Sequence, residues 1–216
     1  MAAYFARPKG AGARPGLLLL QEAFGVNAWI RGVADRFARE GYSVLAPELF
    51  HRTGPGFEGR YDDFPAAREH LQALTVEGLS ADLRAAHAWL EANGSAGDAS
   101  AVGFCMGGRT AFLADAILPL KCAVSFYGAG IAPSLLDRAA SLSGPVLLIW
   151  GGRDAHALPE QTSAVSAALR AAGKSFAVAE FSDGDHGFFC DARPAYHASS
   201  AARAWALTLA FLKTRG

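Results

Sequence analysis

Short apolar runs alternate with longer amphipathic runs along most of the 216-residue chain. The apolar runs have the length of buried strands, and the amphipathic runs repeat their apolar residues at helical spacing. Strands are predicted over residues 17–20, 43–46, 99–103, 122–127, 145–150 and 175–181. Helices are predicted over 29–40, 65–93 (two helices that break near Gly78), 108–117, 159–172 and 195–213. This alternation predicts an α/β fold, a mostly parallel sheet with helices on both faces.

The length and composition fit a single domain over residues 1–216, with 51% apolar and 19% charged residues. Twenty basic and twenty acidic residues leave no net charge, so neither nucleic acid nor an anionic membrane is expected as a partner. The first residues lack a signal-peptide pattern, and no apolar run reaches membrane-spanning length. We therefore expect a cytoplasmic protein that is a monomer or a small homo-oligomer.

The pentapeptide Gly103-Phe104-Cys105-Met106-Gly107 joins a predicted strand to a predicted helix. This is the layout of a nucleophile elbow, G-x-S-x-G, with a thiol in place of the hydroxyl. A cysteine at a helix N-terminus is activated because the helix dipole favours the thiolate. The alternative is a structural cysteine buried in a tight turn. Cys122 and Cys190 are far from Cys105 in sequence, and the odd number and wide spacing predict neither a disulfide framework nor a zinc site.

A nucleophilic thiol needs a histidine as base and an acid that orients it. His186 follows the last predicted strand, and Asp154 follows the strand over residues 145–150. The order Cys105, Asp154, His186 is that of the α/β-hydrolases. Asp183 and Asp185 are rival acids, but residues so close to the histidine more often shape its turn. We therefore predict a Cys105–His186–Asp154 triad.

Two further features have open interpretations. Glu22 directly follows the strand over residues 17–20, where it is either functional, solvated, or held by Arg31. The irregular segment over residues 50–64 is rich in Gly, Pro and Arg and is either a lid over a pocket or a plain surface loop.

Four motifs together resemble the dienelactone hydrolase family, which contains the carboxymethylenebutenolidases. They are Gln21-Glu22-x-Phe24-Gly25-Val26-Asn27, Gly103-Phe104-Cys105-x-Gly107-Gly108, Gly151-Gly152-x-Asp154 and Asp185-His186-Gly187-Phe188. The resemblance runs from about residue 17 to about residue 212. It implies an α/β-hydrolase fold and a catalytic Cys105–His186–Asp154 triad. It also implies that Glu22 contacts the resting thiol and that the backbone N–H groups of Ala23 and Met106 form the oxyanion hole.

The family binds its substrate carboxylate with arginines, one of them four residues after the histidine, where this chain has Cys190. Arg193 is displaced from that position by three residues. The candidate substrate-binding residues are therefore Phe24, Arg60, Arg68, Phe188 and Arg193.

The sequence predicts a hydrolase of small carboxylic esters or lactones that uses a covalent thioester intermediate. The alternative is a small-molecule-binding or redox-sensing protein in which Cys190 would resolve an oxidised Cys105. A third interpretation keeps the enzyme but limits Glu22 to holding an arginine. No dinucleotide fingerprint or metal-ligand spacing occurs, so no cofactor and no metal are expected.

Overall fold

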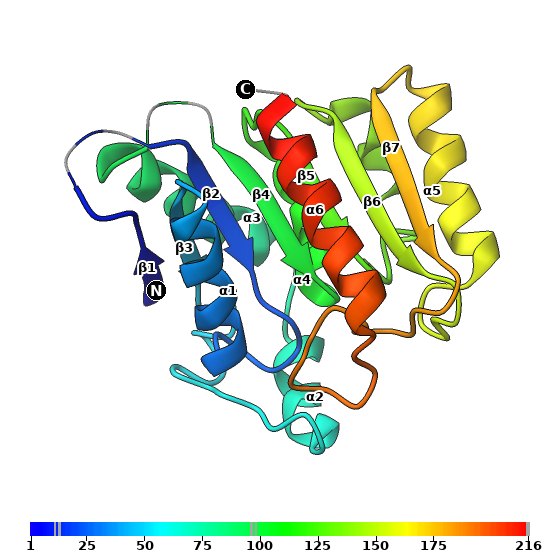
Figure 1. Ribbon diagram of the computed structural model, residues 1–216, viewed down its shortest axis with the longest axis horizontal. Coiled ribbons are helices and arrows are strands. Elements are labelled where there is room, and N and C mark those ends of the chain that lie inside the picture. The colour runs from blue at the N-terminus through cyan, green and yellow to red at the C-terminus, as the bar shows by residue number, and fades with distance from the viewer. Residues whose placement is uncertain (11, 13, 96, 98, 215–216) are drawn as a thin grey trace.

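The computed structural model describes residues 1–10, 12, 14–95, 97 and 99–214. Within these residues, seven strands form one sheet in the order β1-β3-β2-β4-β5-β6-β7 (Figure 1). Strand β1 is antiparallel to β3, and the other neighbouring strands pair in parallel. The strands are β1 (Ala3–Ala6), β2 (Gly16–Leu20), β3 (Ser43–Pro47), β4 (Ser100–Phe104), β5 (Ala123–Phe126), β6 (Val146–Gly151) and β7 (Phe176–Phe181).

Helices follow most of the strands, as the alternation predicts. They are α1 (Ala28–Arg39), α2 (Phe64–Gln72), α3 (Val76–Ala92), α4 (Met106–Ile117), α5 (Pro159–Ala171) and α6 (Ala198–Thr214), with a short 3-10 helix η1 (Leu136–Ser141). None of the helices in the described part of the chain is long and apolar enough to cross a membrane.

The central strands are buried on both faces, which explains their continuous apolar runs. In β2, Leu17 and Leu19 pack toward α1 and α6, whereas Leu18 and Leu20 pack toward α3, α4 and α5. Figure 1 shows α1 and α6 lying across one face of the sheet. The sheet is therefore the middle layer of three, and its parallel strands bring their carboxyl ends to one edge.

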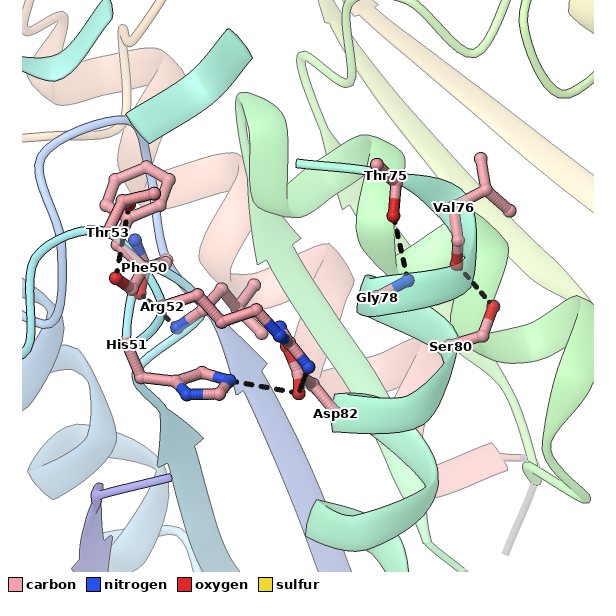
Figure 2. Close-up of polar contacts among 11 residues, drawn as sticks. Phe50, His51, Arg52, Thr53, Thr75, Val76, Gly78, Ser80 and Asp82 are labelled. Atoms are coloured by element: carbon pink, nitrogen blue, oxygen red, sulfur yellow. Dashed lines mark hydrogen bonds and ion pairs between the residues drawn. The ribbon is translucent and has the colours of Figure 1, made fainter. Parts of the chain in front are cut away.

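The segment over residues 50–63 lies at this edge and is tied to the body of the protein. Arg52 makes a two-pronged ion pair with the buried Asp82 of α3, at 2.6 and 2.7 Å. His51 contacts the same carboxylate at 3.1 Å (Figure 2). The ring of Phe57 packs on those of Phe50 and His70. These contacts hold the segment in one place at the edge of the sheet.

One predicted helix boundary requires correction, and one strand was not predicted. Two helices do occupy residues 64–92, but they separate at residues 73–75 and not near Gly78. Thr75 caps α3, and its hydroxyl accepts a hydrogen bond from the Gly78 N–H at 3.0 Å (Figure 2). Gly78 therefore lies in the first turn of α3, where an N-cap hydroxyl satisfies its free N–H group. Strand β1 was not predicted, because four half-exposed residues carry little periodic signal.

Asp115 in α4 is a buried acid away from the C-terminal edge of the sheet. Its Oδ1 accepts hydrogen bonds from Gly144 N and Ser143 Oγ, both at 3.0 Å. Its Oδ2 has no hydrogen-bond partner among the described residues. Burial raises the pKa of Asp115 to about 7, although these two hydrogen bonds and the charge of Lys174 oppose the rise. The folded protein therefore favours the protonated carboxyl group.

We predict that the Asp115→Asn variant gains stability relative to the wild type as the pH rises from about 4 to about 7. The folded-state pKa lies above the unfolded value, so the unfolded chain releases this proton first and wild-type stability falls over that range. The full shift corresponds to a difference of up to about 4 kcal/mol. Urea denaturation of both proteins at about pH 4 and about pH 8 measures it. A stability difference that stays constant with pH would contradict the assignment.

Candidate active site

Cys105 lies at the turn between β4 and α4, with φ 56° and ψ −119°. A non-glycine residue rarely adopts this conformation, which stores strain and needs support from its surroundings. The Cys105 N–H donates to the Phe126 carbonyl at 3.0 Å, which ties the turn to the neighbouring strand. The side chain is partly exposed. The alternative of a fully buried structural cysteine does not describe this position.

Glycines on either side make the turn possible. A Cβ atom on Gly103 would overlap the carbonyl oxygen of Gly107. A Cβ atom on Gly107 would overlap the carbonyl oxygen of Leu20 and lie 2.5 Å from that of Gln21. The first turn of α4 therefore packs directly against the end of β2, with backbone touching backbone.

His186 and Asp154 come from the ends of neighbouring strands and meet below the protein surface. His186 Nδ1 lies 2.8 Å from Asp154 Oδ2, with the two side chains 9% and 0% exposed. The other oxygen of Asp154 accepts a hydrogen bond from the His156 backbone N–H at 2.7 Å. Of the rival acids, Asp185 binds the His186 backbone N–H, and Asp183 pairs with Arg153 at the surface. Asp154 is thus the acid that contacts the His186 ring.

The protonation of His186 depends on its contacts with both Asp154 and Cys105. Burial opposes the positive charge of His186, but hydrogen bonds to Asp154 and to Cys105 raise its pKa to about 10. Burial also disfavours the charge of Asp154, yet the His186 contact lowers the pKa of Asp154 overall. The arrangement favours an imidazolium that is paired with the Asp154 carboxylate and hydrogen-bonded to Cys105.

Glu22 at the end of β2 is almost completely buried and pairs with Arg193. Glu22 Oε1 lies 3.2 Å from Arg193 Nη1, while Glu22 Oε2 has no hydrogen-bond partner among the described residues. Burial raises the pKa of Glu22, and the charges of Arg193 and His186 offset this only in part. Arg31 pairs with Glu58 and contacts the Val26 carbonyl, so the alternative that Arg31 holds Glu22 is wrong.

Arg193 crosses the loop that carries His186. Its guanidinium lies over the rings of Phe24 and Tyr61, at 5.7 and 5.9 Å from their centroids. Gly187 makes room for it, because a Cβ atom there would lie 2.6 Å from Arg193 Cζ. The Tyr61 hydroxyl accepts a hydrogen bond from Asn27 Nδ2 at 3.1 Å. The 50–63 segment therefore contributes an aromatic side chain to this group.

The other candidate substrate-binding residues lie elsewhere. Arg60 pairs with Asp62, and its side chain is 78% exposed. Arg68 is exposed on α2. Phe188 is completely buried and packs on Phe181 and Tyr127, so it belongs to the core. Among the five candidates, Phe24 and Arg193 are brought together with Glu22.

Cys190 is completely buried, and burial raises the pKa of its thiol to about 12. Its thiol is therefore held in the neutral form, which is a poor nucleophile toward a sulfenic acid. This environment disfavours a redox pair between Cys190 and Cys105.

Three residues of this region were not singled out from the sequence: Tyr61, Tyr127 and His156. The Tyr127 and His156 rings lie 5.1 and 4.8 Å from the His186 ring, both edge-on. Tyr127 has a positive φ of 38° directly after β5, and Tyr61 lies in the irregular segment. The position of His156, two residues after Asp154, was the one signal that could have drawn attention to it.

The family resemblance predicts the Ala23 and Met106 backbone N–H groups as the oxyanion hole. The N–H groups of Ala23 and Met106 donate no hydrogen bond to another described residue, although both residues are buried. Met106 is the first residue of α4, where backbone N–H groups lack partners within the helix.

Comparisons with known proteins identify the family of this chain. The model of the dienelactone hydrolase family matches residues 1–216. A protein of Salmonella typhimurium, provisionally named carboxymethylenebutenolidase, is 38% identical over 218 residues, which cover 95% of this chain and 79% of the relative. A relative of the same provisional name from Synechocystis is 33% identical, covering 95% of this chain and 88% of its own.

A crystal structure of a protein from Klebsiella pneumoniae, provisionally named dienelactone hydrolase, superposes with a TM-score of 0.87 at 35% identity. The match covers 96% of this chain and 90% of that one. The fold is thus that of the α/β-hydrolases, as the sequence predicted. The chain belongs to the dienelactone hydrolase family and is a hydrolase.

We predict that Gly107→Ala abolishes most hydrolytic activity and lowers the free energy of unfolding by several kcal/mol, roughly 3 or more. The added methyl group must displace the end of β2, because the overlapping atoms belong to the backbone. Urea denaturation and ester hydrolysis measure the two effects. Gly32→Ala in α1 is the matched control, because a Cβ atom there meets nothing within 4 Å. Equal stability of the two variants would contradict this account of the turn.

Proposed function

We propose that the protein hydrolyses small carboxylic esters or lactones with Cys105 as nucleophile, His186 as acid and base, and Asp154 as the orienting group. The observation that carries the proposal is the buried 2.8 Å contact between His186 and Asp154, coupled to a partly exposed thiol on a strained turn. A structural cysteine requires neither the strain nor the buried charges.

In the first step, the Cys105 sulfur attacks the carbonyl carbon, and the carbonyl electrons move to oxygen. The free N–H groups of Ala23 and Met106 would stabilise that oxyanion, at roughly 3 kcal/mol for each donor. The carbon–oxygen bond of the ester then breaks, and the His186 proton moves to the leaving oxygen. The products of this step are an alcohol or enol and a thioester on Cys105.

In the second step, neutral His186 takes a proton from water, and the water oxygen attacks the thioester. The carbon–sulfur bond breaks, which releases the acid and restores the thiolate and the imidazolium. Asp154 keeps the same ring nitrogen of His186 occupied throughout. Lactones of enols and enol esters suit a thiol, because the released enol tautomerises and does not return to the thioester.

Arg193 is the residue that best fits a substrate carboxylate. It is the candidate arginine that reaches the buried group around Glu22, and its side chain remains 19% exposed. Its contact with Glu22 is a single hydrogen bond of 3.2 Å, which leaves other donors of the guanidinium free for a ligand. We infer that Arg193 serves where the family has an arginine three positions earlier.

The position of Glu22 supports the interpretation in which it holds an arginine. An unpaired guanidinium in this pocket would be strongly disfavoured by burial, and the Glu22 carboxylate neutralises it. Only Glu22 Oε1 is used in this pair, and Glu22 Oε2 has no hydrogen-bond partner among the described residues.

We predict that Cys105→Ala lowers kcat/KM for p-nitrophenyl acetate and for a dienelactone by at least about 10³-fold, because it removes the nucleophile. Initial rates with purified protein measure this. Cys190→Ala is the matched control, since it removes a buried thiol and should retain most of the activity. Equal rates for the wild type and Cys105→Ala would refute the proposed nucleophile.

We predict that Arg193→Gln raises KM for carboxylate-bearing esters by about tenfold or more and changes KM for neutral esters little, because a charge-assisted hydrogen bond is lost. Arg60→Gln should leave both unchanged. Since the single variant leaves Glu22 unpaired, the double variant with Glu22→Gln tests whether the loss persists without a buried charge. A normal KM for the carboxylate ester in the double variant would exclude Arg193 as its binding residue.

A further inference from the structure

His156 is a second imidazole at the proposed active site, and neither step of the reaction uses it. Its ring lies 4.8 Å from the His186 ring, at 68° to it. His156 is exposed, whereas His186 is 8% exposed and Tyr127, the other ring against His186, is completely buried. His156 is therefore the solvent-facing neighbour of the proposed acid and base.

A hydrogen bond fixes the backbone of His156. The His156 N–H donates to Asp154 Oδ1 at 2.7 Å, so the residue belongs to the turn that orients Asp154. Asp154 itself is buried and bound at both oxygens. The charge of neighbouring Arg153 is paired with Asp183 at 3.1 Å. The His156 ring contacts the His186 ring and has no hydrogen bond of its own to another described side chain.

The order of the strands relates His156 to the path of a bound ester. Ala23 follows β2, Cys105 follows β4 and His156 follows β6, and these strands lie in that order in the sheet (Figure 1). With the carbonyl oxygen on the Ala23 amide, the ester points that oxygen toward β2. Its leaving oxygen must lie at His186, because His186 supplies the proton. Asp154, the acid that contacts His186, follows β6. Because the His156 ring lies against the His186 ring on the β6 side, atoms next to the leaving oxygen are within reach of His156.

We propose that His156 recognises the leaving group, by donating a hydrogen bond to an acceptor oxygen carried next to the leaving oxygen. The preferred substrates would be esters or lactones of alcohols, phenols or enols that bear such a second oxygen. This inference rests on the proposed hydrolytic function and adds a specificity-determining residue to it.

Two phenyl acetates of the same shape test the proposal: 2-methoxyphenyl acetate and 2-ethylphenyl acetate. They differ in one acceptor oxygen, and their phenols have similar acidity. We expect His156→Phe, which retains an aromatic ring against His186, to lower the methoxy-to-ethyl ratio of kcat/KM about fivefold, the effect of one ordinary hydrogen bond. Hydrolysis of the ethyl compound should change little.

His156→Asn and His156→Gln place an amide N–H near the positions of Nδ1 and Nε2, and at least one of them should restore the ratio. An equal methoxy-to-ethyl ratio of kcat/KM in the wild type and in His156→Phe overturns the proposal. This holds even if the variant hydrolyses both compounds more slowly. The hydrolytic function is tested separately by Cys105→Ala in the same assay. Full activity of that variant would refute the mechanism, whereas its inactivity beside an unchanged ratio would refute only the role of His156.

Discussion

The close approach of α4 to the end of β2 is the contact on which the arrangement of the site depends. Because Gly103 and Gly107 have no side chains, backbone touches backbone, and Cys105 is forced to a positive φ. A residue in that conformation is held by the sheet and the helix together and has little freedom to relax. The Cys105 thiol therefore lies at the edge of the sheet where the parallel strands end. The other residues of the site lie at the same edge.

Two ion pairs with buried carboxylates lie near the thiol, and each joins separate segments of the chain. His186 pairs with Asp154, and Arg193 pairs with Glu22. Burial disfavours each separate charge, so a pair is stable where both partners are held at hydrogen-bond distance. In the proposed mechanism, His186 of the first pair donates a proton and Asp154 orients the His186 ring. In the same mechanism, Arg193 of the second pair binds a substrate carboxylate.

The parts of the fold that were predictable have strong local signals. The strand runs over residues 17–20 and 145–150 are continuous and apolar because helices cover both faces of the sheet. The break between α2 and α3 was misplaced, because Gly78 is a weaker signal for a helix boundary than the Thr75 cap that precedes it. Strand β1 was not predicted because its stability comes from pairing with β3, and a run of four residues carries no signal of that pairing.

Cys105, Asp154 and His186 could be placed together from sequence because each follows its own strand, and parallel strands end at a common edge. The positions of Tyr61 and His156 could not be predicted. The position of Tyr61 depends on how an irregular segment folds back, and that of His156 depends on the direction of one turn. The choice of Arg193 over Arg60 was also beyond the sequence. Both are candidates in the sequence, but burial against Glu22 depends on three segments meeting in space. The sequence determines which strand each functional residue follows. Only the contacts between remote segments determine which charged side chains are buried and paired.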